Sequence, residues 1–170
     1  MISDEVQIPD SIRNLVEMAP AEDLVLRILR NALPDVPIYS RIPGEHDIWP
    51  TQEGLLIVPR RGSSYGVWGG ESRFMDHAGV EIHVFTYGPD DEERAAWAHE
   101  ACRVAFRNAL INQDYYPGLG SLCGHYVEEE ARRKADWATA SGPVQYADLP
   151  TGWSRYEARH QIYIRRPIWG

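Results

Sequence analysis

The chain has 170 residues, of which 44% are hydrophobic and 25% charged, and its formal net charge is −8 at pH 7. This length and composition predict one soluble globular domain with a sizeable core, and the negative charge argues against a nucleic-acid-binding surface, which needs clustered Lys and Arg. The polar, acidic first residues and the lack of a long apolar run predict neither a signal peptide nor a membrane span, and Cys102 and Cys123 predict small core residues in a reducing compartment.

The first quarter of the chain predicts one main helix. Met1 to Ala19 is expected to be an N-terminal leader or arm, in which Asp10 can cap a short helix, and residues 20–170 are expected to form a single domain. Apolar residues then recur with helical spacing until Pro34 ends the helix. They are Leu24, Val25, Ile28, Leu29, Ala32 and Leu33. Val36 to Ile42 predicts a short strand, and its proline favours an edge or a strand start.

The next part predicts two strands separated by a glycine-rich loop. Leu55 to Val58 is a short continuous apolar run, typical of a buried strand. In Gly62 to Gly70, glycines alternate with Tyr65 and Trp68, which favours a loop that projects from the body. Val80 to Tyr87 then alternates along an extended run rich in β-branched and aromatic residues, and this predicts a strand.

A long helix is predicted after Gly88-Pro89. Asp90 is expected to cap it, with Glu93 completing a capping box, and the acidic first turn suits the positive end of the helix dipole. One broad apolar stripe follows, which predicts a face covered by a sheet. It comprises Trp97, Ala98, Ala101, Cys102, Ala105, Phe106, Ala109 and Leu110. If Trp97 is buried in that stripe, its replacement by Ala is expected to cost about 3–5 kcal/mol.

The last third predicts two more strands. One lies within Leu119 to Glu130; Ala131 to Pro150 is expected to be irregular; and Arg155 to Arg166 alternates like a half-buried strand. The order of elements is therefore α-β-β-β-α-β-β. It predicts an α+β fold, with a mostly antiparallel sheet of four to five strands and two main helices packed on one face.

The histidines and acidic residues do not form a recognised catalytic or metal motif. HxH and HExxH spacings, GxSxG and a P-loop are not found, so no catalytic, cofactor or metal residues are predicted. The acidic residues Asp90 to Glu93 are explained by a helix N-terminus rather than by a divalent cation. His83 and His160 lie in predicted strands and could meet across the sheet.

Aromatic residues in predicted loops and termini indicate protein–protein contacts, because interfaces are enriched in aromatic residues and Arg. Those outside the predicted core faces include Trp49, Tyr65, Trp68, Tyr115, Tyr116, Trp153 and Trp169. The expected contact residues are Tyr65, Trp68 and Arg73 in the projecting loop, with Arg60 and Arg61 at its base.

Three stretches together resemble the tail terminator (tail completion) proteins of long-tailed bacteriophages, particularly those of actinobacterial phages. They are AEDLVLRILRNALPDVPIYSRIP near the start, GVEIHVFTYGPDDEERAAWAHEACRVAF in the middle and GPVQYADLPTGWSRYEARHQIYIRR near the end. Such proteins typically open with a helix, Leu-Pro and a strand, and end in a pattern that is matched here by Arg155-Tyr156-x-Ala158 through Ile162-x-Ile164-Arg165. The resemblance covers about Pro20 to Pro167 in order and spacing.

The resemblance implies a structural virion protein without enzymatic activity, cofactor or bound metal. Such proteins form a ring, usually of six subunits, that sits on the tail tube, stops its growth and presents a surface to the head-closure and connector proteins. The expected location is the tail or neck of a virion assembled in the host cytoplasm. Genomic DNA would pass through the lumen without specific binding, which an acidic protein permits. A ring also needs a heterologous interface, and sheet edges such as Val36–Ile42 are candidates.

Three alternatives remain open at this point. Another head-tail connector protein, such as a head-closure protein, belongs to the same class. A small hydrolase could use His83 and His160 with Asp or Glu partners. A peptide-binding module could add a strand at its sheet edge and would stay monomeric.

Overall fold

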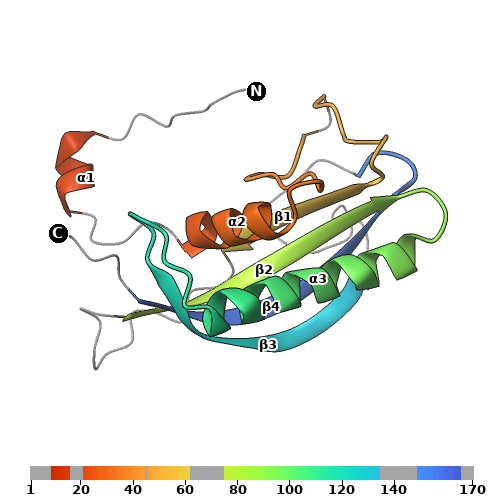
Figure 1. Cartoon of the computed structure of the whole chain (residues 1–170). Coiled ribbons are helices and arrows are strands. Elements are labelled where there is room, and N and C mark those ends of the chain that lie inside the picture. Colours follow the sequence, from red (N-terminus) through yellow and green to blue (C-terminus); the bar gives the residue numbers. More distant parts are fainter. Residues whose placement is uncertain (1–8, 16–20, 45, 62–74, 135–148, 166–170) are drawn as a thin grey trace.

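Four antiparallel strands form one sheet in the order β1-β2-β4-β3 (Figure 1). The computed structural model describes residues 9–15, 21–44, 46–61, 75–134 and 149–165. Its elements are α1 (Asp10–Leu15), α2 (Ala21–Ala32), β1 (Leu55–Arg61), β2 (Met75–Tyr87), α3 (Asp91–Ile111), β3 (Ser121–Lys134) and β4 (Trp153–Arg165). The predicted α+β class, with helices on one face of the sheet, is confirmed. In the described residues, no helix combines the length and apolar character needed to cross a membrane.

The two central strands, β2 and β4, divide the sheet into two chemically different faces. They pair along their full length, from Met75 opposite Arg165 to Tyr87 opposite Trp153. Because directly paired residues share a face, the even-numbered residues of both strands lie together on the helix side. They include Val80, Ile82, Val84, Tyr156, Ala158, His160, Ile162 and Ile164, all buried. The odd-numbered residues lie on the other side of the sheet.

Helices α2 and α3 cover the first of these faces and close the main core, as Figure 1 shows. The apolar stripe predicted for α2 is buried at Leu24, Val25, Ile28 and Leu29. On α3 the buried positions recur every three or four residues, so one side of the helix faces the sheet. These positions are Ala95, Ala98, His99, Cys102, Ala105, Phe106 and Ala109.

Trp97 is not part of the buried stripe of α3. Its side chain is 72% exposed, so the prediction that it lies against the sheet is wrong. Successive residues of an α-helix are rotated by about 100° around its axis. The middle of the buried side, marked by Ala95, Ala98 and Cys102, therefore lies about 140° around the axis from Trp97. Small side chains form much of the buried stripe, and they let the helix approach the sheet without an indole between them.

The predicted capping box at the start of α3 is also absent. Asp90 is the N-cap, but its backbone is left-handed (φ 61°, ψ 30°), and its side chain makes no capping hydrogen bond. A capping side chain needs an extended backbone to reach the first free amides, and this conformation does not provide it. Arg94 holds the helix start instead. Its guanidinium donates hydrogen bonds of 2.9 Å to the carbonyls of Tyr87 and Glu53, so it ties the helix to the β2 end and to the residue before Gly54.

The strand predicted at Val36–Ile42 is reduced to a single parallel bridge between Ile38 and Ile57 at the outer edge of β1. Ile57 exchanges two backbone hydrogen bonds of 3.0 Å with the residues on either side of Ile38. The ladder cannot extend in either direction, because Pro37 and Pro59 lack the N–H groups that would donate the next hydrogen bonds. The Ile38 carbonyl points away from β1 and accepts hydrogen bonds from Arg30 of α2, at 3.2 and 2.9 Å. The strand prediction was therefore wrong in extent, although the segment does lie at an edge.

Strand β3 is longer than predicted, since Ala131 to Lys134, expected to be irregular, continue it. Its pairing with β4 shifts register three times, between Leu122 and Gly124, between Val127 and Glu129, and between Glu129 and Arg132. Such shifts bend a strand and re-aim its side chains.

A second, smaller apolar cluster lies on the opposite face of the sheet. Trp49 packs edge-on against Phe85 and contacts Trp153, with ring centroids 5.4 and 5.1 Å apart. Leu56 and Val58 complete the buried set. The expectation that Trp49 and Trp153 lie outside the core is therefore wrong. An aromatic residue in a loop can still be buried when the loop folds back over a sheet.

Candidate functional site

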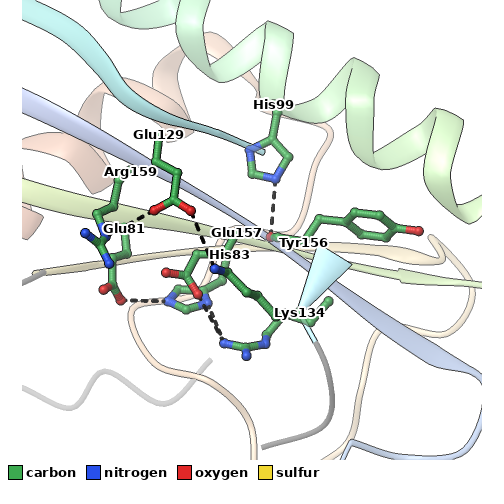
Figure 2. Close-up of polar contacts among 9 residues, drawn as sticks. Glu81, His83, His99, Glu129, Lys134, Tyr156, Glu157 and Arg159 are labelled. Atoms are coloured by element: carbon green, nitrogen blue, oxygen red, sulfur yellow. Dashed lines mark hydrogen bonds and ion pairs between the residues drawn. The ribbon is translucent and has the colours of Figure 1, made fainter. Parts of the chain in front are cut away.

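Beyond the second apolar cluster, the face of the sheet opposite α2 and α3 carries a group of charged and polar side chains, here called the polar cluster (Figure 2). Its members come from β2, β4 and β3, and they are Glu81, His83, Arg155, Glu157, Arg159, Glu129 and Lys134. Several are almost inaccessible to solvent: His83 is 2% exposed and Arg155 7%. Buried charged groups need partners, so the contacts within the cluster decide what it can do.

His83 uses both ring nitrogens inside the cluster. Nε2 lies 3.3 Å from a carboxylate oxygen of Glu81, and Nδ1 lies 3.4 Å from Nη1 of Arg155. A guanidinium can only donate, so Nδ1 accepts, and Nε2 carries the proton that Glu81 receives. The same Nη1 lies 3.4 Å from Glu157, directly opposite His83 on β4. Figure 2 shows the imidazole of His83 beside the carboxylate of Glu81.

One row of the cluster alternates in charge across the whole sheet. Arg60 of β1 pairs with Glu81 of β2, Glu81 with Arg159 of β4, and Arg159 with Glu129 of β3. Directly opposed residues of opposite charge stabilise neighbouring strands. The hydrogen bond from His83 holds the pKa of the Glu81 carboxyl below its usual value, and the positive charges of Arg159 and Arg60 act in the same direction.

Three basic side chains lie near the carboxylate of Glu129 on the outer strand, β3. Arg132 and Lys134 lie 3.7 Å from one of its carboxylate oxygens, and Arg159 lies 3.8 Å from the other. These separations exceed hydrogen-bond length, and Arg132 is largely exposed. Each pair therefore contributes little, and the register shifts of β3 around Glu129 are what bring the three together.

The chemistry of this arrangement is that of a paired network rather than of an open reaction centre. General base catalysis needs a histidine nitrogen within reach of a substrate proton. Here His83 is enclosed, and its two nitrogens are engaged with Glu81 and Arg155. A substrate would have to displace one of these contacts before it reached the ring.

His160 lies on the opposite face from His83, so the prediction that the two meet across the sheet is wrong. His160 pairs in register with Val80, which faces the helices, whereas His83 pairs with Glu157 on the face opposite α2 and α3. Under α3, Nδ1 of His160 lies 2.8 Å from Nε2 of His125, and both rings contact Phe106. In such a pair one ring donates and the other accepts.

Burial between α3 and the sheet keeps three histidines neutral. Desolvation lowers the pKa of His160 to about 3, with help from His125 and His99, and lowers the pKa of His125 and of His99 to about 4. His99 is held by a contact of 3.2 Å between its Nε2 and the carbonyl of Tyr156, where Nε2 donates (Figure 2). Within the described residues, no group of three or more His, Cys, Asp or Glu side chains could hold a metal ion.

Of the five expected contact residues, the structure describes Arg60 and Arg61. Both line a pocket of about 320 Å³ at the end of β1, together with Arg41 and Glu22. Arg61 is exposed, whereas Arg60 is half-buried at the end of the charged row. Tyr65, Trp68 and Arg73, like the predicted loop Gly62–Gly70, lie outside the described residues.

Sequence reasoning missed the buried charges of β4. A half-buried strand was predicted for Arg155 to Arg166, which leaves its polar residues facing solvent. Instead, Arg155 and Gln161 are buried, and Gln161 donates a hydrogen bond of 2.7 Å to Glu128. The available signal was charge complementarity between Glu81 on one predicted strand and Arg155 and Arg159 on another. It could not be used because the order of strands in the sheet was unknown.

No protein-family model matches the chain, and a search of the curated proteins finds no similar sequence.

Proposed function

We propose that this protein is a structural virion protein, the tail terminator of a long-tailed bacteriophage. In this role a ring of subunits sits at the head-proximal end of the tail tube, stops its polymerisation and provides the surface to which the head is joined. Its partners would be further copies of itself, the major tail tube protein and the head-closure proteins. It would act without catalysis or a cofactor.

The observation that supports this proposal most is the position of the closing motif in the fold. Four of the residues that carry the resemblance, Tyr156, Ala158, Ile162 and Ile164, lie on β4 and are buried on the side of the sheet that faces the helices. β4 pairs with both β2 and β3, so the motif forms an interior strand of the sheet. A family held together by shared architecture, rather than by a reaction, is expected to repeat core positions of this kind.

The alternative hydrolase hypothesis loses its basis. It required His83 and His160 on one face with acidic partners, and these histidines lie on opposite faces of the sheet. Neither histidine suits catalysis by itself. Both ring nitrogens of His83 contact neighbouring side chains, and His160 is buried beneath α3.

Electron microscopy of the purified protein, alone and mixed with isolated tail tubes, tests the proposal. We expect rings, either free or capping one end of the tube, and tubes of defined length when the protein is added during polymerisation. A protein that remains monomeric and ignores the tubes would refute the proposal and favour a peptide-binding module.

A matched pair of charge reversals makes the test specific. Arg61→Glu changes an exposed residue at the expected interface, whereas Arg27→Glu changes an exposed residue on α2. Both variants should fold, because both side chains are exposed. We expect only Arg61→Glu to reduce the fraction of capped tubes; equal capping by both variants would remove Arg61 from the interface.

A further inference from the structure

The side of α3 turned away from the sheet carries apolar residues where a surface helix normally has polar ones. Trp97 is 72% exposed and Ile111 65%, and Val104 lies midway between them. Each is seven residues from the next, so the three follow one another along one side of the helix, two turns apart. Ala101 and Asn108 fill the intervening positions. We call Trp97, Ala101, Val104, Asn108 and Ile111 the outer seam.

The outer seam is separate from the face that α3 uses inside the subunit. The buried face, including Ala98, Cys102, Ala105 and Phe106, already completes the main core. Single exposed apolar residues are common on protein surfaces, but here exposed Trp97 and Ile111 flank half-buried Val104 at heptad spacing and form an apolar stripe. Exposed Trp is the residue type most enriched at binding hot spots. This stripe therefore points to a docked helix.

The arrangement of charge along the seam indicates the orientation of that helix. The first turn of α3 holds Asp91, Glu92 and Glu93, and Glu100 follows beside the seam; Arg107 lies on the same side, toward the C-terminus. An identical helix running in the opposite direction would place its Arg107 near Glu100 and its Glu100 near Arg107. Opposed helix dipoles favour the same orientation.

The apolar residues have the same symmetry. Trp97 and Ile111 lie at equal distances from Val104, about 10.5 Å along the axis on either side. A twofold axis at Val104 would bring Val104 against its own copy and each Trp97 against the Ile111 of the other chain. Isologous pairs of this kind require a self-complementary surface, and the order of apolar and charged residues along the seam meets that requirement.

We propose that the outer seam is the contact surface for a second copy of this chain, with two α3 helices packed antiparallel about Val104. This inference goes beyond the proposed function and does not depend on it. A ring uses heterologous contacts, whereas this pair is isologous and leaves the Arg60–Arg61 region uncovered. The contact involves one helix from each chain, below the usual size of about 1,200 Å² for stable complexes, so the pair is expected to be reversible at micromolar concentration.

Sedimentation velocity on the full chain, from about 1 to about 200 µM, tests the pairing. We expect a concentration-dependent dimer that Trp97→Glu weakens at least tenfold. Ile48→Glu places the same charge on an exposed apolar residue outside α3; it is the matched control and should leave the dimer unchanged. A wild-type protein that stays monomeric over this range, or a dimer unaffected by Trp97→Glu, would overturn the proposal.

Charge exchange then tests the orientation. Glu100→Arg and Arg107→Glu should each weaken the dimer, and the double variant should restore it, because the two charges meet between chains. Glu100 also pairs with Arg103 in its own helix, at 2.6 Å, so circular dichroism of each variant separates loss of helix from loss of pairing. No restoration by the double variant in a folded protein would refute the antiparallel arrangement.

Binding of the seam to tail tubes instead of to a second copy would refute the choice of partner. Loss of tube capping with the dimer intact would count only against the proposed function.

Discussion

Lowering the pH from about 7 to about 5 is expected to destabilise the fold by about 4 kcal/mol, because buried histidines must stay neutral in it. His99 and His160 have folded pKa values of about 4 and about 3, chiefly through desolvation, against 6.5 in the unfolded chain. Within the described residues, Nδ1 of His99 and Nε2 of His160 are buried without a hydrogen-bond partner. Protonation there would place an unpaired donor and a charge in the core.

The sign follows from proton linkage. The unfolded chain binds protons below about pH 6.5 while the folded state does not, so stability falls as the pH drops and the loss is complete only near the folded pKa values. Each of the two histidines contributes about 2 kcal/mol between about pH 7 and about pH 5. His125 is less buried and adds less. The sum is a large part of the roughly 5–15 kcal/mol by which domains are stable.

Urea unfolding followed by circular dichroism at several pH values measures this loss. His99→Gln removes one of the titrating groups, and its amide can still donate to the Tyr156 carbonyl that His99 now contacts. We expect this variant to lose about 2 kcal/mol less than the wild type over the same pH range. His46→Gln, at an exposed loop position, is the control. Equal pH dependence in wild type and His99→Gln would refute the reasoning.

Three further outcomes follow from the packing of α3. Phe106→Ala should cost about 3–5 kcal/mol in thermal or urea unfolding, whereas Trp97→Ala should change stability by no more than about 0.5 kcal/mol; similar losses in both would contradict their burial. Arg94→Ala should cost about 1–3 kcal/mol by removing two charged hydrogen bonds to carbonyls, and Arg94→Lys should recover only part. Burial raises the pKa of the Cys102 thiol to about 12 and also raises that of Cys123, which is less enclosed. A thiol reagent should therefore modify Cys123 first in the folded protein, and mass spectrometry of peptides reports the order.

The elements that sequence predicted best are those whose side chains repeat with one clear period. The alternation of Val80 to Tyr87 and of Arg155 to Arg166 identified the two central strands, and the stripe of α2 identified its buried side. In these segments local pattern and tertiary packing agree, so no knowledge of neighbours was needed.

Predictions failed where a distant residue decided the outcome. The segment Val36–Ile42 forms only one bridge partly because β1 has Pro59 where the next N–H donor is needed, and no pattern within the segment itself records that. Trp97 was placed in the core because α3 has apolar residues on two sides, and a single sequence does not say which side meets the sheet. The polar cluster could not be foreseen either, since it depends on β4 lying between β2 and β3.

The Ile38 bridge makes the two outer edges of the sheet unequal. At the outer edge of β1, the backbone N–H and C=O of Ile57 are already hydrogen-bonded to the Ile38 segment, so an incoming strand could not pair there. At the other edge, no strand in the described residues pairs with the outer side of β3. Edge-to-edge growth into a fibre needs two receptive edges on every molecule. With one edge interrupted, strand addition ends after two molecules join through β3, so this asymmetry protects the chain against open-ended aggregation. It also means that a closed ring would have to be held by side-chain contacts rather than by a continuous sheet.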